Sequence, residues 1–168
     1  MAFSIYDASV PALVRALDGL ENILDKGAAS AEARKIEFKV FAQARLYPDM
    51  LPLCAQVWLA TEFAARGASR LAGTEVPNYP YEGESLEELK ARIALARDHV
   101  KGFTREQVEG GEDRTFTAQL GPRSVDFTGR DYLTRFTLPN VYFHVATAYD
   151  ILRHNGVELT KTDYSGGF

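Results

Sequence analysis

Histidines are the residues in this 168-residue chain best suited to acid–base or metal chemistry, and there are three of them. Two, His144 and His154, fall in one long apolar segment between Thr128 and Gly156. Ten residues at about 1.5 Å each separate them by roughly 15 Å along a helix, whereas two ligands of one zinc ion each lie about 2 Å from it. We expect His154, in the last helical turn, to cap free carbonyl groups. His144 is therefore the better candidate.

A polar stripe accompanies His144 along its predicted helix. Thr137, Asn140 and Thr147 share its face at helical spacing. On another predicted helix Gln56 lies among apolar neighbours, and an unpaired buried amide costs about 1–3 kcal/mol, so we predict that Gln56 faces His144. Two interpretations stay open. His144 is either a satisfied core histidine, or it lines a pocket at the centre of the protein as an acid, a base or a single ligand.

The other reactive groups suggest less chemistry. Cys54 lies on an apolar helix, where a lone cysteine is typically inert packing. Arg45 and Asp49 lie at the entry to that helix. They either form a surface ion pair or a helix cap, or they line the mouth of the pocket. His99 lies beside an apolar stripe, so we expect it at the boundary of the core. The sequence contains no Gly-rich phosphate loop, nucleophile elbow, paired cysteines or His-x-x-x-His pair.

Four long helical patterns must position these residues. Each shows apolar residues at three- and four-residue spacing, with capping residues at its ends. The predicted helices run from Asp7 or Ser9 to Lys26 with Gly27 as the stop, from about Asp49 to Leu71, from Ser85 to Gly102, and from Thr128 to Asn155. In the second of them, either regular helix begins near Pro52 or the first turn is distorted. Pro139 interrupts the last of them, because proline removes a backbone hydrogen bond. Residues 73–83, rich in proline and glycine, form a loop.

One β-hairpin precedes the last helix. Apolar residues alternate with polar ones over 116–120 and again over 125–127, and a four-residue loop at 121–124 separates the two strands. The sequence thus predicts an all-α fold, an antiparallel four-helix bundle with a small β-hairpin, as a single domain over residues 1–168. The tail, residues 160–168, is either disordered or docks its aromatic residues on the protein.

Composition excludes several classes of protein. A hydrophobic content of 46% and a charged content of 25% are typical of soluble globular proteins. A net charge of −4 argues against nucleic-acid binding. The sequence contains no run of about 18 apolar residues, which is the length that a membrane-spanning helix needs. We expect no signal peptide, and the single cysteine fits the cytoplasm.

Three motifs resemble those of a known family. They are YDASVP at 6–11, RLYPDM at 45–50, and PNVYFHVATAYDILRHNG at 139–156. The chain resembles, over nearly its whole length, an uncharacterised bacterial family of unknown function grouped with the DinB/YfiT-like metalloenzyme superfamily. The resemblance implies a four-helix bundle, a homodimer and a bacterial cytoplasm.

The superfamily site implied by this resemblance is a metal held by three histidines. One comes from the second helix and two, four residues apart, come from the fourth. His144 matches the first of that pair, but Ala148 stands in place of the second and Gln56 where the histidine of the second helix is expected. Glutamine is a poor zinc ligand and alanine is none. The resemblance therefore supports the fold and the location of the pocket, and these residues argue against the metal.

Two functions follow as hypotheses. In the first, the protein is a scaffold or binds a small molecule through Arg45, Asp49, Gln56, Asn140 and His144, without a cofactor. In the second, it is a transferase or hydrolase of the DinB/YfiT type acting on small molecules, with His144 as acid/base or as the sole protein ligand of a metal.

Overall fold

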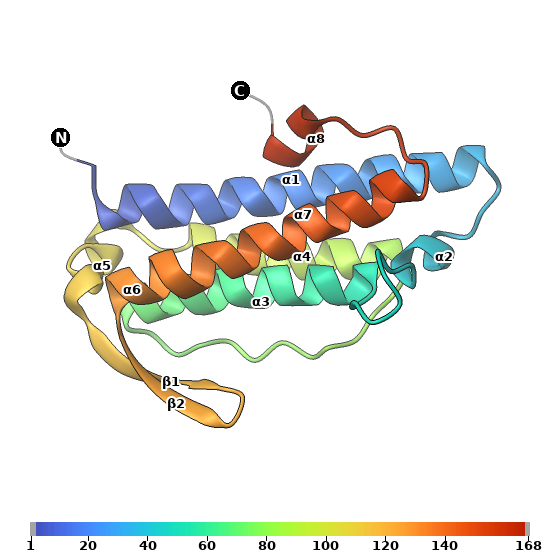
Figure 1. Cartoon of the computed structure of the whole chain (residues 1–168). Coiled ribbons are helices and arrows are strands. Elements are labelled where there is room, and N and C mark those ends of the chain that lie inside the picture. The colour runs from blue at the N-terminus through green and yellow to red at the C-terminus, as the bar shows by residue number, and fades with distance from the viewer. Residues whose placement is uncertain (1–2, 167–168) are drawn as a thin grey trace.

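The protein is mostly helical, with one antiparallel hairpin before its last long helix (Figure 1). The computed structural model describes residues 3–166. The elements are α1 (Ile5–Ala33), α2 (Phe38–Ala42), α3 (Leu53–Ala72), α4 (Leu86–Lys101), α5 (Arg105–Val108), η1 (Gly111–Asp113), β1 (Thr115–Leu120), β2 (Arg123–Thr128), α6 (Gly129–Tyr132), η2 (Leu133–Thr137), α7 (Leu138–His154) and α8 (Lys161–Ser165). The predicted helical fold with a hairpin is confirmed, and short helices such as α5 and α8 are additional.

The four long helices enclose the core. Helices α1 and α3 each pack against both α4 and α7, and Figure 1 shows α1 and α7 lying alongside each other above α3 and α4. The fully buried side chains come from all four helices; they include Leu13, Leu17, Leu20, Leu53, Val57, Leu89, Ile93, Val145 and Ile151. Within the residues described, no helix is both long and apolar enough to cross a membrane.

The first helix is longer than predicted at both ends. Ser4 caps it, and Asp7 is the third residue of a capping box rather than the cap itself. Gly27 does not end the helix, which continues to Ala33. Gly27 is buried, and a Cβ there would approach the Leu152 side chain at 3.0 Å, so this glycine allows α7 to pack closely on α1. The glycine at position 27 is therefore explained by close packing of two helices and not by the end of a helix.

The last long helix begins with a π-helical turn. Thr128 caps α6 as predicted, accepting a hydrogen bond from the backbone N–H of Asp131. The chain then forms a π-helix over Leu133–Thr137 before α7, where Pro139 occupies the first turn. Proline lacks the N–H that would close a regular α-helical bond to Arg135, and just before it the N–H of Leu138 bonds to the carbonyl of Leu133, five residues back. The predicted interruption is thus a change of helix type.

The hairpin has a shorter loop than predicted. Leu120 pairs with Arg123, so Gly121 and Pro122 alone form the turn, and Arg123 and Ser124 belong to β2. Gly121 has a φ of 59°, the left-handed conformation that a two-residue hairpin turn requires at its first central position. The hairpin packs on the helices through an aromatic cluster centred on Tyr132, which the rings of Phe116 and Phe127 contact edge-on at 5.1 and 5.2 Å.

The described part of the tail docks on the protein. Helix α8 packs against α1 and α7, and the Tyr164 ring meets the Tyr149 ring edge-on at 6.3 Å. Of the two predicted alternatives, docking therefore describes residues 160–166. The aromatic residue Phe168 lies outside the described residues.

Candidate functional site

The predicted pair of Gln56 and His144 is present. His144 on α7 lies 2.7 Å from Gln56 on α3, measured from Nδ1 to the side-chain oxygen. Both side chains are buried, with 8% and 2% of their surface exposed. The Gln56 amide nitrogen donates to the carbonyl of Leu51 at 3.0 Å, which fixes which end of the amide faces His144. The glutamine prediction was correct because the buried amide needed such partners.

This hydrogen bond determines where His144 carries its proton. The Gln56 oxygen can only accept, so Nδ1 of His144 must donate, and a neutral ring then leaves Nε2 with a free lone pair. Burial lowers the pKa of His144 from 6.5 to about 4, so the ring is neutral at physiological pH. Among the described residues, the structure records no hydrogen-bond partner for Nε2. The site thus presents one unpaired, neutral acceptor.

Aromatic rings enclose the imidazole. Phe63, two turns along α3 from Gln56, stacks on His144 with a centroid distance of 5.6 Å and an interplanar angle of 7°. Phe143 meets the ring edge-on at 5.3 Å and is itself 56% exposed. Flat apolar contacts and one acceptor nitrogen suit a flat or apolar partner that carries a hydrogen-bond donor.

The segment before α3 is tied to the same site. Arg45 donates to the carbonyl of Met50, and Gln56 donates to the carbonyl of the next residue, Leu51. Of the two predicted alternatives for Arg45, an ion pair with Asp49 is absent from the described residues. Asp49 is exposed on this segment. Arg45 therefore holds the backbone of the segment before α3 in place. Gln56 connects this segment to His144, because its amide bonds both the Leu51 carbonyl and the imidazole.

The polar stripe on α7 is not one network. The Asn140 amide donates to the carbonyl of Phe136 at 2.7 Å, four residues earlier, beside the π-helical turn. Thr137 is 1% exposed, and its hydroxyl has no partner among residues 3–166. It lies against Gly67 of α3, where any Cβ would overlap the Thr137 side chain. Asn140 and Thr137 therefore serve the junction with the π-helix.

The residues present do not fit a three-histidine metal site. In the part of the chain that the structure describes, no three His, Cys, Asp or Glu side chains are grouped closely enough to hold a metal ion. Ala148 is buried one turn after His144 and offers no donor atom, and the Gln56 oxygen is engaged by His144 itself. Only Nε2 of His144 remains, and zinc sites in proteins use three or four protein ligands.

The remaining candidates are structural. Cys54 is buried, and burial raises the pKa of its thiol, as expected for inert packing. His99 is half-buried at the boundary of the core, bonded to the Ser69 hydroxyl at 2.8 Å. His154 does not cap α7 as predicted. It is exposed, and the amide of Asn155 reaches the carbonyl of Ile151 instead.

Sequence reasoning missed a buried arginine. Arg92 on α4 is 8% exposed, and its guanidinium donates to the Thr61 hydroxyl and to the carbonyls of Trp58 and Pro80. The guanidinium also lies over the Tyr79 ring, 4.6 Å from its centroid. These contacts fasten the 73–83 loop to α3 and α4. The position of Arg92 between Leu89 and Ala96 on the apolar stripe was the available signal.

Comparison with known proteins identifies the family. The profile described as a domain of unknown function (DUF1993) matches residues 5–165. The chain belongs to this family. A crystal structure of a DinB family member protein from Shewanella denitrificans is similar over 98% of this DUF1993 chain and 93% of the other, with 34% identity and a TM-score of 0.88. A comparison with curated proteins gave no match. The DUF1993 chain thus has a DinB-like fold, as the resemblance implied.

Proposed function

We propose that this DUF1993 protein binds a small molecule at His144 without a metal and does not transform it. The observation that carries the proposal is the 2.7 Å contact from His144 Nδ1 to the Gln56 oxygen. It fixes the tautomer in which Nε2 is a free acceptor, and the same contact occupies the atom that a metal would need from Gln56.

The pKa of His144 favours binding over catalysis. A general base works best when its pKa lies near the operating pH. Burial lowers the pKa of His144 to about 4, so near pH 7 the imidazole accepts a hydrogen bond but holds a transferred proton weakly. A histidine-assisted transferase or hydrolase, the alternative function, would gain from a raised value. The geometry therefore supports an acceptor that orients a ligand.

The proposed ligand is small, largely apolar and carries one O–H or N–H donor. Phe63 and Phe143 supply flat apolar contacts on two sides of the imidazole, and Nε2 accepts the donor. In this proposal Arg45 and Asp49, in the segment that leads to Leu51, form the rim of the site. Asn140, one turn before His144, completes it and holds the helix in shape.

We also propose that the four long helices form an antiparallel bundle of the DinB type and that the protein is a cytoplasmic homodimer. Exposed Tyr81, in the loop before α4, and Leu95 on α4, each at 56%, supply apolar surface that a second copy would cover. Light scattering at micromolar concentration tests the dimer, and a monomer there contradicts it.

Metal analysis tests the absence of a metal directly. We expect protein purified without an affinity tag to contain no stoichiometric transition metal, and His144→Ala to leave that content unchanged. Stoichiometric zinc or nickel that disappears in His144→Ala would overturn the proposal in favour of a metal site.

Ligand binding is tested with phenol and anisole, which share a ring but differ in the donor. We expect phenol to shift the ¹⁵N resonance of His144 Nε2 and anisole to leave it unchanged, because only phenol donates a hydrogen bond. His144→Phe keeps the aromatic volume and removes the acceptor, so it should abolish phenol binding. Equal responses to both probes, or none to phenol, contradict the proposed site.

A further inference from the structure

A second site lies on the opposite side of α7 from His144. A cavity of about 500 Å³ opens between α1, α7 and α8. Pro11, Ala12 and Ala16 of α1 give it an apolar surface, and Tyr142 of α7 and Tyr164 of α8 contribute aromatic rings. Cavities of this volume accommodate small organic ligands. Neither Gln56 nor His144 lines it.

The α8 wall of this cavity is held in place by specific contacts. Asn22 of α1 donates to the backbone carbonyl of Asp163 at 3.0 Å, and the Asp163 carboxylate pairs with Lys26 at 2.6 Å. Gly19 lies directly beneath, where any Cβ would overlap the carbonyl of Tyr164. Three residues of α1 therefore hold α8 in place and position the Tyr164 ring at the cavity: Gly19, Asn22 and Lys26.

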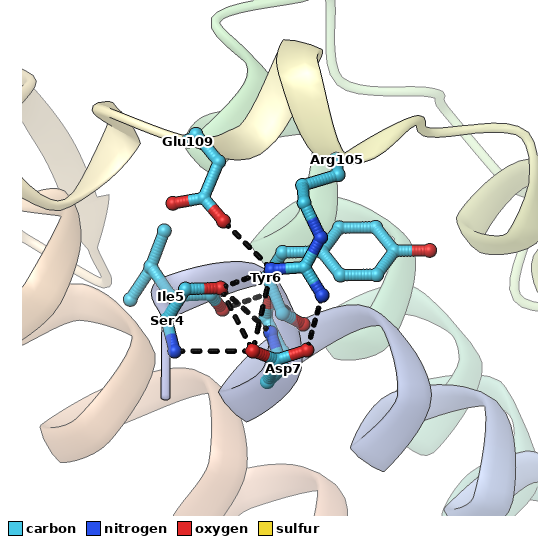
Figure 2. A network of polar contacts seen from close by, with 7 residues as sticks. Ser4, Ile5, Tyr6, Asp7, Arg105 and Glu109 are labelled. Carbon is cyan, nitrogen blue, oxygen red and sulfur yellow. Dashed lines mark hydrogen bonds and ion pairs between the residues drawn. The ribbon is translucent and has the colours of Figure 1, made fainter. Parts of the chain in front are cut away.

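Arg15 is the cation of the cavity, and it has no ion pair or side-chain hydrogen bond with any residue in the range 3–166. The acids around it are engaged elsewhere. Asp7, which also lines the cavity, is held by Arg105 and Ser4, as Figure 2 shows, and the hydrogen bond from Arg105 lowers the pKa of Asp7 to about 2. Asp18 pairs with Arg97 at 3.1 Å. With no partner among the described residues, the guanidinium can pair with an anion from solution.

We infer that this cavity binds a small aromatic carboxylate, whose acid group pairs with Arg15 and whose ring lies on Pro11, Ala12 and Ala16 between Tyr142 and Tyr164. A guanidinium presents parallel N–H donors that match the two oxygens of a carboxylate. The phenol rings favour a flat apolar body, which they contact through edge or offset stacking. The charge of Arg15 selects the acid over a neutral analogue, and the apolar surface selects it over a simple inorganic anion.

The test compares 2-naphthoate with its neutral ester methyl 2-naphthoate, which carries no hydrogen-bond donor for His144, by isothermal titration calorimetry. The two probes share a ring system and differ in charge. With the unmodified chain we expect naphthoate to bind at least about tenfold more tightly, a ratio that corresponds to about 1.4 kcal/mol. Arg15→Gln should remove that preference by weakening naphthoate alone. Arg123→Gln, an identical charge change at the exposed first residue of β2, should leave both affinities unchanged.

Two further variants locate the site. Ala12→Trp should fill the cavity and abolish binding of both probes, with circular dichroism confirming that the variant folds. His144→Phe should leave naphthoate binding unchanged, which separates this site from the proposed His144 site. The inference is overturned if naphthoate does not bind the unmodified chain, if its preference survives Arg15→Gln, or if His144→Phe removes its binding.

Discussion

The two sides of α7 match their polar groups in different ways. On the side facing α3, His144 and Gln56 are buried, and His144 Nδ1 and the Gln56 oxygen satisfy each other inside the protein. On the side facing α1 and α8, the acids Asp7 and Asp163 are paired, while Arg15 has no ion-pair partner within residues 3–166. A buried group must find its partner within the fold, whereas a group at an open cavity is satisfied by water until a ligand arrives. Substitutions on the α3-facing side should therefore change the free energy of unfolding. Substitutions on the side facing α1 and α8 should mainly change local structure and ligand binding.

Replacing His144 should have the largest effect. His144→Leu leaves the Gln56 oxygen buried without a donor and removes the stacking on Phe63, for a loss of about 3 kcal/mol. In a domain of this size that corresponds to a fall in melting temperature of roughly 6–12 °C. The exposed His154→Leu is the matched control and should change stability by less than about 0.5 kcal/mol. Adding Gln56→Leu to His144→Leu should restore part of the loss, and strictly additive losses would contradict the hydrogen bond.

Lowering the pH should reduce the free energy of unfolding through His144. The folded-state pKa of His144 is lowered from 6.5 to about 4, so between these values the unfolded chain binds more protons than the folded one. Its contribution is fully present above pH 6.5 and is lost as the pH falls toward 4, by up to about 3 kcal/mol. Urea denaturation at a series of pH values measures this. The slope over that window should be smaller in His144→Leu, and an unchanged slope would show that His144 is not the group responsible.

On the other side of α7, Gly19→Ala should act locally. Its new Cβ overlaps the Tyr164 carbonyl, so α8 must move away from α1. We expect faster tryptic cleavage after Lys161, with a loss of global stability of only about 1 kcal/mol, because α8 is a short surface element. Gly102→Ala, at the end of α4 with a φ of −66°, is the control and should leave cleavage unchanged. A collapse of global stability in Gly19→Ala would remove the contrast between the two sides.

The smallest effect belongs to Arg105. In Arg105→Gln the pKa of Asp7 should rise from about 2 toward its ordinary value of 3.8, because the hydrogen bond from Arg105 is the main cause of its depression. The ion pair lies at the surface, so its stabilisation, present above about pH 4 and lost as the pH falls toward 2, should be small. A ¹³C titration of the Asp7 carboxyl measures the shift. Lys39→Gln, which removes another surface ion pair, should leave that carboxyl unaffected.

Sequence patterns predicted the α3-facing side better than the other. Gln56 and His144 each lay at a fixed position on a regular helix, so helical spacing and the cost of a buried amide were sufficient to pair them. The prediction that the first helix ends at Gly27 was wrong. A glycine that ends a helix and a glycine that allows a neighbouring helix to pack closely cannot be distinguished in the sequence. The carbonyl of Met50, which Arg45 binds, carries no side-chain signal at all.

The cavity beside Arg15 was beyond prediction because it depends on where α8 docks. A five-residue helix has too few residues to show a periodic pattern, and the polar residues that hold it are Asn22 and Lys26, which resemble ordinary solvated positions on α1. That Arg15 has no partner in the described part of the chain follows only once the partners of Asp7 and Asp18 are known. Both facts belong to tertiary structure.

The π-helical turn at Leu133–Thr137 gives the chain a defined tolerance to deletion. Each π-type hydrogen bond spans five residues rather than four, so the turn holds one residue more than a regular α-helical path. Removing the exposed Thr134 converts the turn to α-helix and keeps Tyr132 and His144 each facing its own neighbours. The same deletion between Pro139 and His144 has no surplus residue to absorb it and rotates the imidazole by about 100° away from Gln56.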